Sequence, residues 1–211
     1  MPGNDDGELL SWRNPGYENS GDHPVVCVSR GDAESYAAWK SLQLSSRTEL
    51  PAPLRLPTEA EFEHALRTAG RTSETWGPEA IDRRVCGLAN IGDAHFKKQF
   101  SGWPNTALCD DGFTFTAPVA SYPADGLGFH DISGNVWEWA ADCYRASYEN
   151  APVDGSAGQA SNPDSKCETG VLRGASFDDG PQYQRFANRV RVPISVGAWV
   201  FGIRLAHSLS D

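Results

Sequence analysis

The sequence predicts an α+β domain that is rich in loops, with two helices in its first half and short antiparallel strands after them. Two capping patterns mark helix starts before residue 70, and none of similar strength follows. From Trp76 onward, short apolar pieces alternate with Gly, Pro, Asn and Asp. Helices followed by runs of short strands are typical of the α+β class. The 211 residues, 39% of them hydrophobic, suffice for one core.

The first helix follows a short apolar run. Val25–Val28 is rich in β-branched residues and predicts a buried strand. Residues 29–32 then place a serine three positions before an aspartate, as at a helix N-terminus. Over residues 33–42, Tyr36 and Trp39 fall close to one face, with small alanines beside them. This spacing predicts an amphipathic helix.

The second helix has the stronger start signal. Thr58 stands three residues before Glu61, so each side chain can bond the other residue's backbone amide. Apolar residues then recur at helical spacing through Phe62–Ala69, and Gly70 predicts the end of the helix.

The rest of the domain is expected to consist of short strands and loops. Residues 148–168 contain almost no core residues and predict a long surface loop. Residues 1–23 predict an irregular lead-in to a domain at 24–206, followed by a tail at 207–211. The candidate strands are Thr114–Val119, Val136–Ala140, Gly170–Ser176 and Phe201–Leu205.

The net charge and the cysteine content limit the partners and the cellular location that we expect. Eighteen basic and 28 acidic residues give a formal charge of −10, which disfavours nucleic acid and anionic membranes as partners. The N-terminus does not read as a signal peptide, and no stretch reaches the ~20 apolar residues of a membrane span. The five cysteines lack CxxC spacing, so free thiols and a cytoplasmic location are expected.

Five segments occur in an order that resembles the formylglycine-generating-enzyme, or sulfatase-modifying-factor, domain family. The most specific are RLPTEAEFE and the signature DISGNVWEW at Asp131–Trp139. The resemblance implies a C-type-lectin-like fold and runs from about Trp12 to Ala206, without a counterpart for the family's N-terminal portion. The segments are His23–Trp39, Leu54–Gly70, Ala117–Asp142, Leu172–Phe177 and Gly202–Ala206.

The catalytic residues of the family are missing. The resemblance implies a pair of copper-binding cysteines just after the motif at Arg173–Phe177, yet no cysteine follows Cys167. Copper(I) requires soft thiolate ligands, so no copper is expected. Related iron enzymes place their iron histidines largely in an additional helical domain. The five histidines here stand in unrelated contexts, so no iron is expected either; they are His23, His64, His95, His130 and His207.

Calcium is the cofactor that the sequence still supports, in a structural role. Asp131 and Glu138 are two carboxylates around a Gly-Asn turn, and hard cations favour carboxylate and carbonyl oxygens. The resemblance implies that these two side chains bind Ca²⁺ together with the carbonyls of Gly134 and Val136. The alternative is that the carboxylates only cap turns.

A second calcium site is implied by the same resemblance. It matches Asn90 and Ile91 in one segment and Asp111 and Phe113 in another. Side chains alternate there with main-chain oxygens, as calcium sites require.

Two arginines and two tryptophans are interpreted as structural. Arg173 and Arg204 each stand near glycine among apolar residues, which predicts that they are buried and paired with acids. Trp137 and Trp139 of the signature are interpreted as core residues.

The segment Asp178–Phe201 is the candidate ligand-binding surface. It combines aromatic anchors with small neighbours, a composition typical of recognition surfaces. The core alternative applies to Phe186 and to one of Trp199 or Phe201. The candidate residues are Asp178, Asp179, Tyr183, Val190, Val192, Ile194, Val196, Ala198, Trp199, Val200 and Phe201.

The leading hypothesis is a non-catalytic module that binds a protein ligand. The chain also resembles the variable proteins of diversity-generating retroelements, which lack the catalytic cysteines and end shortly after a motif like Gly202-Ile-Arg204. One alternative is an oxidoreductase of the same family with an altered, cysteine-free site. Another is an accessory or regulatory domain that a partner chain completes.

Overall fold

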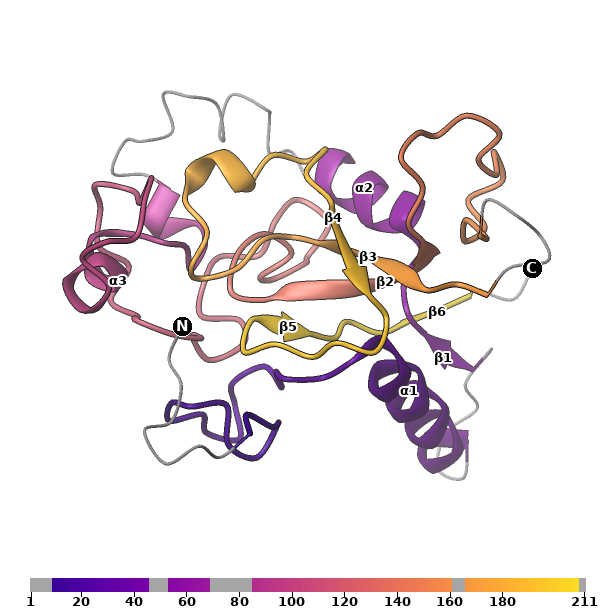
Figure 1. Cartoon of the computed structure of the whole chain (residues 1–211), viewed down its shortest axis with the longest axis horizontal. Helices are drawn as coiled ribbons and strands as arrows, with labels where there is room; N and C mark the ends of the chain where they lie inside the picture. The colour runs from indigo at the N-terminus through magenta and orange to yellow at the C-terminus, as the bar shows by residue number, and fades with distance from the viewer. Residues whose placement is uncertain (1–8, 46–52, 69–84, 161–165, 209–211) are drawn as a thin grey trace.

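The computed structural model describes residues 9–45, 53–68, 85–160 and 166–208 (Figure 1). Short helices and strands are separated by long irregular segments, as the predicted α+β class requires. In chain order they are α1 (Arg30–Ser45), β1 (Leu54–Arg55), α2 (Glu59–Thr68), η2 (Val85–Gly87), α3 (Ala94–Gln99), β2 (Trp137–Cys143), β3 (Thr169–Arg173), η3 (Pro181–Tyr183), β4 (Val190–Pro193), β5 (Phe201–Gly202) and β6 (Ala206–His207).

Four strands form the central sheet in the order β4-β3-β2-β5. β2 pairs with β3 and β3 with β4 in antiparallel fashion, whereas β5 runs parallel to β2. The expectation of antiparallel strands alone is therefore wrong for β5, which reaches β2 only after the chain has crossed from the sheet edge at β4. β1 and β6 form a separate antiparallel pair that includes His207, a residue assigned to the tail by the sequence.

The core is built around the signature strand. Trp139 is fully buried, and its indole Nε1 donates a hydrogen bond to the Val28 carbonyl at 3.0 Å. Trp137 is buried too, so both tryptophans are core residues, as predicted. Phe177 and Trp199 pack in the same cluster with ring centroids 5.2 Å apart.

Both predicted helix caps form. Ser29 and Asp32 exchange side-chain and amide bonds at 2.9 and 3.2 Å, and Thr58 and Glu61 do so at 2.8 and 3.1 Å. α1 differs from expectation in its buried face, because small alanines pack inward while Tyr36 and Trp39 are about half exposed. Figure 1 shows α1 and α2 on opposite sides of the sheet in this view, with α2 packed on β2 and β3.

Two predicted strands do not form. Val25–Val28 is interrupted by Cys27, whose φ of 60° is incompatible with a strand. Thr114–Val119 has no strand partner, because the Asn135 side chain bonds both the amide and the carbonyl of Ala117 at 3.0 and 3.1 Å. Both segments contain buried residues, but isolated backbone bonds, such as that from the Cys27 amide to the Ala198 carbonyl, and the Asn135 side chain replace a strand ladder.

The prediction of free thiols is wrong for four of the five cysteines. Cys86 is bonded to Cys109 and Cys143 to Cys167, which leaves Cys27 as the free thiol. Disulfides persist in oxidising compartments, so the expectation of a cytoplasmic location loses the support that it took from free thiols.

Within the described ranges, no helix is long and apolar enough to cross a membrane.

The disulfides give a direct test. Alkylation of the denatured, unreduced protein should label Cys27 alone, and alkylation after reduction should label all five cysteines, as intact-mass spectrometry would show. Five labels without reductant would contradict both disulfides.

Candidate functional site

Glu138 lies at the centre of the signature strand and is almost fully buried. Both of its carboxylate oxygens accept hydrogen bonds from the Arg204 guanidinium, at 2.7 and 2.8 Å. Arg204 also donates to the His130 carbonyl at 3.0 Å. Burial raises the pKa of Glu138, and the charge of Arg204 opposes that rise. The predicted pairing of Arg204 with an acid is therefore confirmed.

The turn of the signature brings Asp131 to the same place. Asp131, Val136 and Glu138 line one cavity of about 460 Å³ together with Arg204. Asp131 Oδ2 accepts a bond from the Ala120 amide at 2.7 Å, whereas Oδ1 is buried without a hydrogen-bond partner among the described residues. A buried carboxylate oxygen without a partner suits a hard cation. Glu138 suits it less well, because Arg204 occupies both of its oxygens.

Gly134 gives the signature turn its shape. Its φ is +82°, and a Cβ atom there would collide with the carbonyl oxygen of Asn90. The Asn135 amide donates to that same carbonyl at 2.8 Å. Glycine is therefore required at position 134, and the signature turn directly contacts the second predicted calcium site.

The structure brings the four residues of that second site together. Asp111 Oδ2 accepts from the Ile91 amide and Oδ1 from the Phe113 amide, both at 2.9 Å. Asn90 is 1% exposed, and its Oδ1 has no hydrogen-bond partner in the described part of the chain. A buried, unpaired amide oxygen is a hard donor of the kind that calcium binds.

Asp93 is a residue of this site that the sequence reasoning missed. It caps α3, with Oδ1 accepting from the Phe96 amide at 2.9 Å and Oδ2 accepting from the Asp111 amide at 2.5 Å. Burial raises the pKa of Asp93, and burial together with the Asp93 charge raises the pKa of Asp111 to about 7. An aspartate three residues before a phenylalanine is a weak capping signal, which explains the omission.

The residues of the candidate recognition segment do not share one exposed face. Val192, Trp199 and Val200 are buried in the core, so they cannot contact a ligand at the surface. Tyr183 and Val196 are 45% and 40% exposed. The remaining candidates are half-buried, namely Asp178, Asp179, Val190, Ile194, Ala198 and Phe201. The core alternative holds for Phe186 and for Trp199.

Asp178 and Asp179 both contact the hydroxyl group of Ser176. Ser176 Oγ lies 2.5 Å from Asp178 Oδ1 and 2.6 Å from Asp179 Oδ2. The serine has one hydroxyl hydrogen, so the second short contact needs a proton on the carboxyl group itself. Burial, with the Asp179 charge, raises the pKa of Asp178 to about 7; burial also raises that of Asp179.

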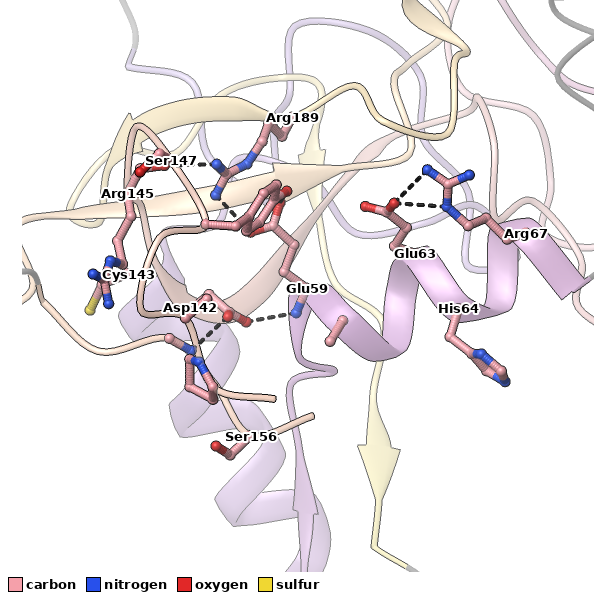
Figure 2. Close-up of a pocket in the computed structure, with 15 residues that line it drawn as sticks. Glu59, Glu63, His64, Arg67, Asp142, Cys143, Arg145, Ser147, Ser156 and Arg189 are labelled. Carbon is pink, nitrogen blue, oxygen red and sulfur yellow. Dashed lines mark hydrogen bonds and ion pairs between the residues drawn. The ribbon is translucent and has the colours of Figure 1, made fainter. Parts of the chain in front are cut away.

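A second cavity, of about 330 Å³, opens between α2 and the loop after β2 (Figure 2). Its base is Glu59, which accepts from Arg173 at 2.8 Å, from Arg189 at 2.7 Å and from the Tyr148 hydroxyl at 3.0 Å. Asp142 bonds the Glu59 amide at 2.6 Å and thereby caps α2. Arg173 is completely buried, which confirms the prediction that it is buried and paired.

Arg189 lines this cavity. Its guanidinium lies 4.7 Å from the Tyr144 ring and 4.6 Å from the Tyr148 ring, and it donates to the Arg145 carbonyl at 2.7 Å. The sequence did not indicate this cavity, because Tyr144 and Tyr148 lie in or just before residues 148–168. That segment has no pattern of core residues and was predicted to be a surface loop. These polar groups bond one another and hold the loop after β2 in place, so we interpret the cavity as structural.

Comparison with known proteins identifies relatives that cover most of the chain. The sequence model of the Sulfatase-modifying factor enzyme 1-like domain matches residues 5–209. The formylglycine-generating enzyme of Streptomyces coelicolor is 36% identical over 194 residues, which cover 86% of this chain and 51% of that protein. The inactive C-alpha-formylglycine-generating enzyme 2 of Bos taurus is 32% identical over 154 residues, 69% of this chain and 43% of that one.

Two solved structures are similar in fold. PvdO from Pseudomonas aeruginosa has a TM-score of 0.74 and 31% identity, with 92% of this chain and 66% of that chain covered. Treponema denticola variable protein 1 has a TM-score of 0.66 and 22% identity, covering 98% and 77%. The chain spans about half the length of the curated relatives that it matches first.

The ion pair between Glu59 and Arg173 at the base of the second cavity should contribute strongly to the free energy of unfolding. Glu59→Gln removes the nearer of the two carboxylates that pair with the buried Arg173 and leaves only Glu63, at 3.2 Å, so the free energy of unfolding should fall by about 3–5 kcal/mol in urea titrations. Glu61→Gln is the matched control, because it keeps the helix cap and removes only the half-exposed pair with Arg55. That control should cost less than about 1 kcal/mol. Equal losses in the two variants would contradict the assignment.

The carboxyl pair should make stability depend on pH. Because the pKa of Asp178 is raised to about 7, the native state keeps a proton that the unfolded chain releases near pH 4. The free energy of unfolding should therefore fall as pH rises from 4 to 7. Asp178→Asn should match the wild type at pH 4 and exceed it at pH 8, in urea titrations with chelator present.

The control for this experiment is Asp154→Asn. Asp154 is exposed, and its hydrogen bond from Ser156 lowers its pKa, so any change should have the opposite sign. A steeper pH dependence in Asp178→Asn than in the wild type would rule out a raised pKa of Asp178.

Proposed function

This chain belongs to the Sulfatase-modifying factor enzyme 1-like domain family, and we propose that it is a non-catalytic member that binds a protein ligand and is rigidified by calcium. The observation that carries the proposal is the Asp178–Ser176–Asp179 group. Its two aspartates directly follow the motif at Arg173–Phe177, where the resemblance places the cysteine pair of the family's catalytic members. Carboxylates are hard ligands and do not hold copper(I).

Two features of the thiols support the absence of copper chemistry. Four of the five cysteines are consumed in disulfides. Cys27 is half-buried, and burial raises its pKa to about 11, which disfavours the thiolate that a metal needs. A catalytic cysteine pair therefore has no counterpart in the described residues.

The outer parts of the segment Asp178–Phe201 are the proposed contact surface. Tyr183 and Val196 present apolar area to solvent, and β4 between them is an edge strand of the sheet. The fold similarity to a variable protein of Treponema denticola agrees with a recognition role for this segment. A negative net charge and this partly apolar face favour a protein partner over nucleic acid or membrane.

Calcium is proposed at both predicted sites with a structural role. Asp131 and Glu138, with the carbonyls of Gly134 and Val136, would hold one ion, and Asn90, Ile91, Asp111 and Phe113 the other. The buried, unpaired oxygens of Asp131 and Asn90 support these assignments. A cation there would add a further link between segments that lie mostly outside the helices and strands.

The second candidate function is an oxidoreductase with an altered site. Identity of 36% to a formylglycine-generating enzyme favours it. Its chemistry would need a transition metal held by ligands other than thiolates.

Metal titration separates the two functions. Under anaerobic conditions, copper(I) and iron(II) should show no stoichiometric tight binding to the folded protein, and a cysteine-containing peptide should remain unoxidised. One equivalent of tightly bound copper or iron would favour the oxidoreductase.

Calcium should raise the melting temperature. A single site occupied at 100 times its dissociation constant adds about 2.7 kcal/mol, and each kcal/mol shifts the midpoint of a domain of this size by about 2–4 °C. Asp131→Asn should lose part of this shift in differential scanning fluorimetry, while a melting temperature that chelator leaves unchanged would remove the calcium proposal.

Diversification of the recognition segment has a genomic test. Sibling genes should differ at the exposed and half-buried positions of Asp178–Phe201 and retain Val192, Trp199 and Val200, which the core requires. A near-copy of the coding sequence for residues 171–206 beside a reverse transcriptase would support the retroelement origin. Differences spread evenly over the whole chain would exclude it.

A further inference from the structure

The Cys86–Cys109 disulfide joins the two halves of the second cation site. Cys86 precedes Asn90 and Ile91 by four and five residues, and Cys109 precedes Asp111 by two. The bond therefore ties the segment that carries one pair of ligands to the segment that carries the other. It closes a loop with a sequence separation of 23, whose interior contains α3.

The disulfide also touches the site directly. Cys86 Sγ lies 3.8 Å from Asp93 Oδ2. This sulfur, one carboxylate oxygen of Asp93 and one of Asp111 all lie within 4.8 Å of one another. The sulfur is thus packed against the two carboxylates that face the site.

Among the residues that the structure describes, these two carboxylates have no partner of opposite charge. Asp93 is completely buried and Asp111 mostly so, yet no ion pair joins either to a basic residue in the described part of the chain. The nearby bases, Lys98 and His95, bind the exposed Asp110. Backbone amides donate to both carboxylates, but two neighbouring buried negative charges still repel each other.

A divalent cation would balance them. Two carboxylates and one Ca²⁺ sum to zero charge, and the neutral amide oxygen of Asn90, buried and unpaired, supplies a further hard donor. This accounts for why Asp93 belongs to the site, although the resemblance to the family implies only Asp111 as its carboxylate.

We propose that the second calcium site is a two-carboxylate site completed by Asp93, and that its affinity depends on the Cys86–Cys109 disulfide. The inference rests on the proposed calcium binding and adds a redox control to it. A dithiol reductant transfers two electrons and two protons to the disulfide, giving the Cys86 and Cys109 thiols and a disulfide in the reductant. The two ligand segments then lose their covalent link, and calcium is released.

Calorimetric titration of CaCl₂ into the folded, oxidised protein tests this proposal. The background is Asp131→Asn, which weakens the other site, so that the second site is observed. Asp93→Asn should weaken its calcium affinity by about 10–100-fold. The double variant Cys86→Ser/Cys109→Ser should weaken it similarly, with circular dichroism to verify the fold.

The second disulfide supplies the matched control. Cys143→Ser/Cys167→Ser removes a covalent link of nearly the same span, 24 residues, at the far end of β2 and β3. It should leave the calcium affinity of the second site unchanged. In this control background, adding dithiothreitol should reproduce the loss and reoxidation should restore it, which keeps the test informative if the serine variants fold poorly.

The outcomes separate the two levels of the argument. If the oxidised wild-type protein binds no calcium, the proposed calcium binding fails. If it binds calcium with the same affinity after reduction of Cys86–Cys109 and after Asp93→Asn, calcium binding stands and the redox control is overturned.

Discussion

Two buried ion pairs at the centre of the sheet hold the rest of the structure in place. Glu138 on β2 and Arg173 on β3 are register partners, yet each takes its counter-charge from elsewhere. Glu138 is bound by Arg204 near the C-terminus, and Arg173 is bound by Glu59 at the start of α2. A buried charge that loses its partner is costly, so these pairs fix the positions of α2 and of the C-terminal segment against the sheet.

The local features of the fold were predictable where they depend on neighbouring residues. The caps at Thr58 and Ser29 and the core tryptophans depend on local patterns, and the structure has all of them. Strands were predicted less well, because Asn135 bonds Ala117 across 18 residues and takes the place of a strand partner. The parallel pairing of β5 with β2 likewise depends on contacts that no local pattern encodes.

The part of the candidate site that the signature forms was predictable from the sequence, whereas the parts that other segments contribute were not. The signature indicated Asp131, Val136 and Glu138, and the structure places them beside one cavity. Asp93 and the disulfides were missed for different reasons. A helix cap resembles any other aspartate in a loop, and pairing among scattered cysteines requires the folded positions of all of them. Val192 was assigned to the candidate ligand-binding surface, although it is the buried residue of β4.

The edge position of β4 carries a risk that its residues offset. An unpaired strand edge can template the addition of strands from other chains, which leads to aggregation. β4 is only four residues long, carries the exposed charge of Arg191 and ends at Pro193, which has no amide hydrogen to donate. The short length of β4, the charge of Arg191 and the proline at its end therefore protect this edge against self-association.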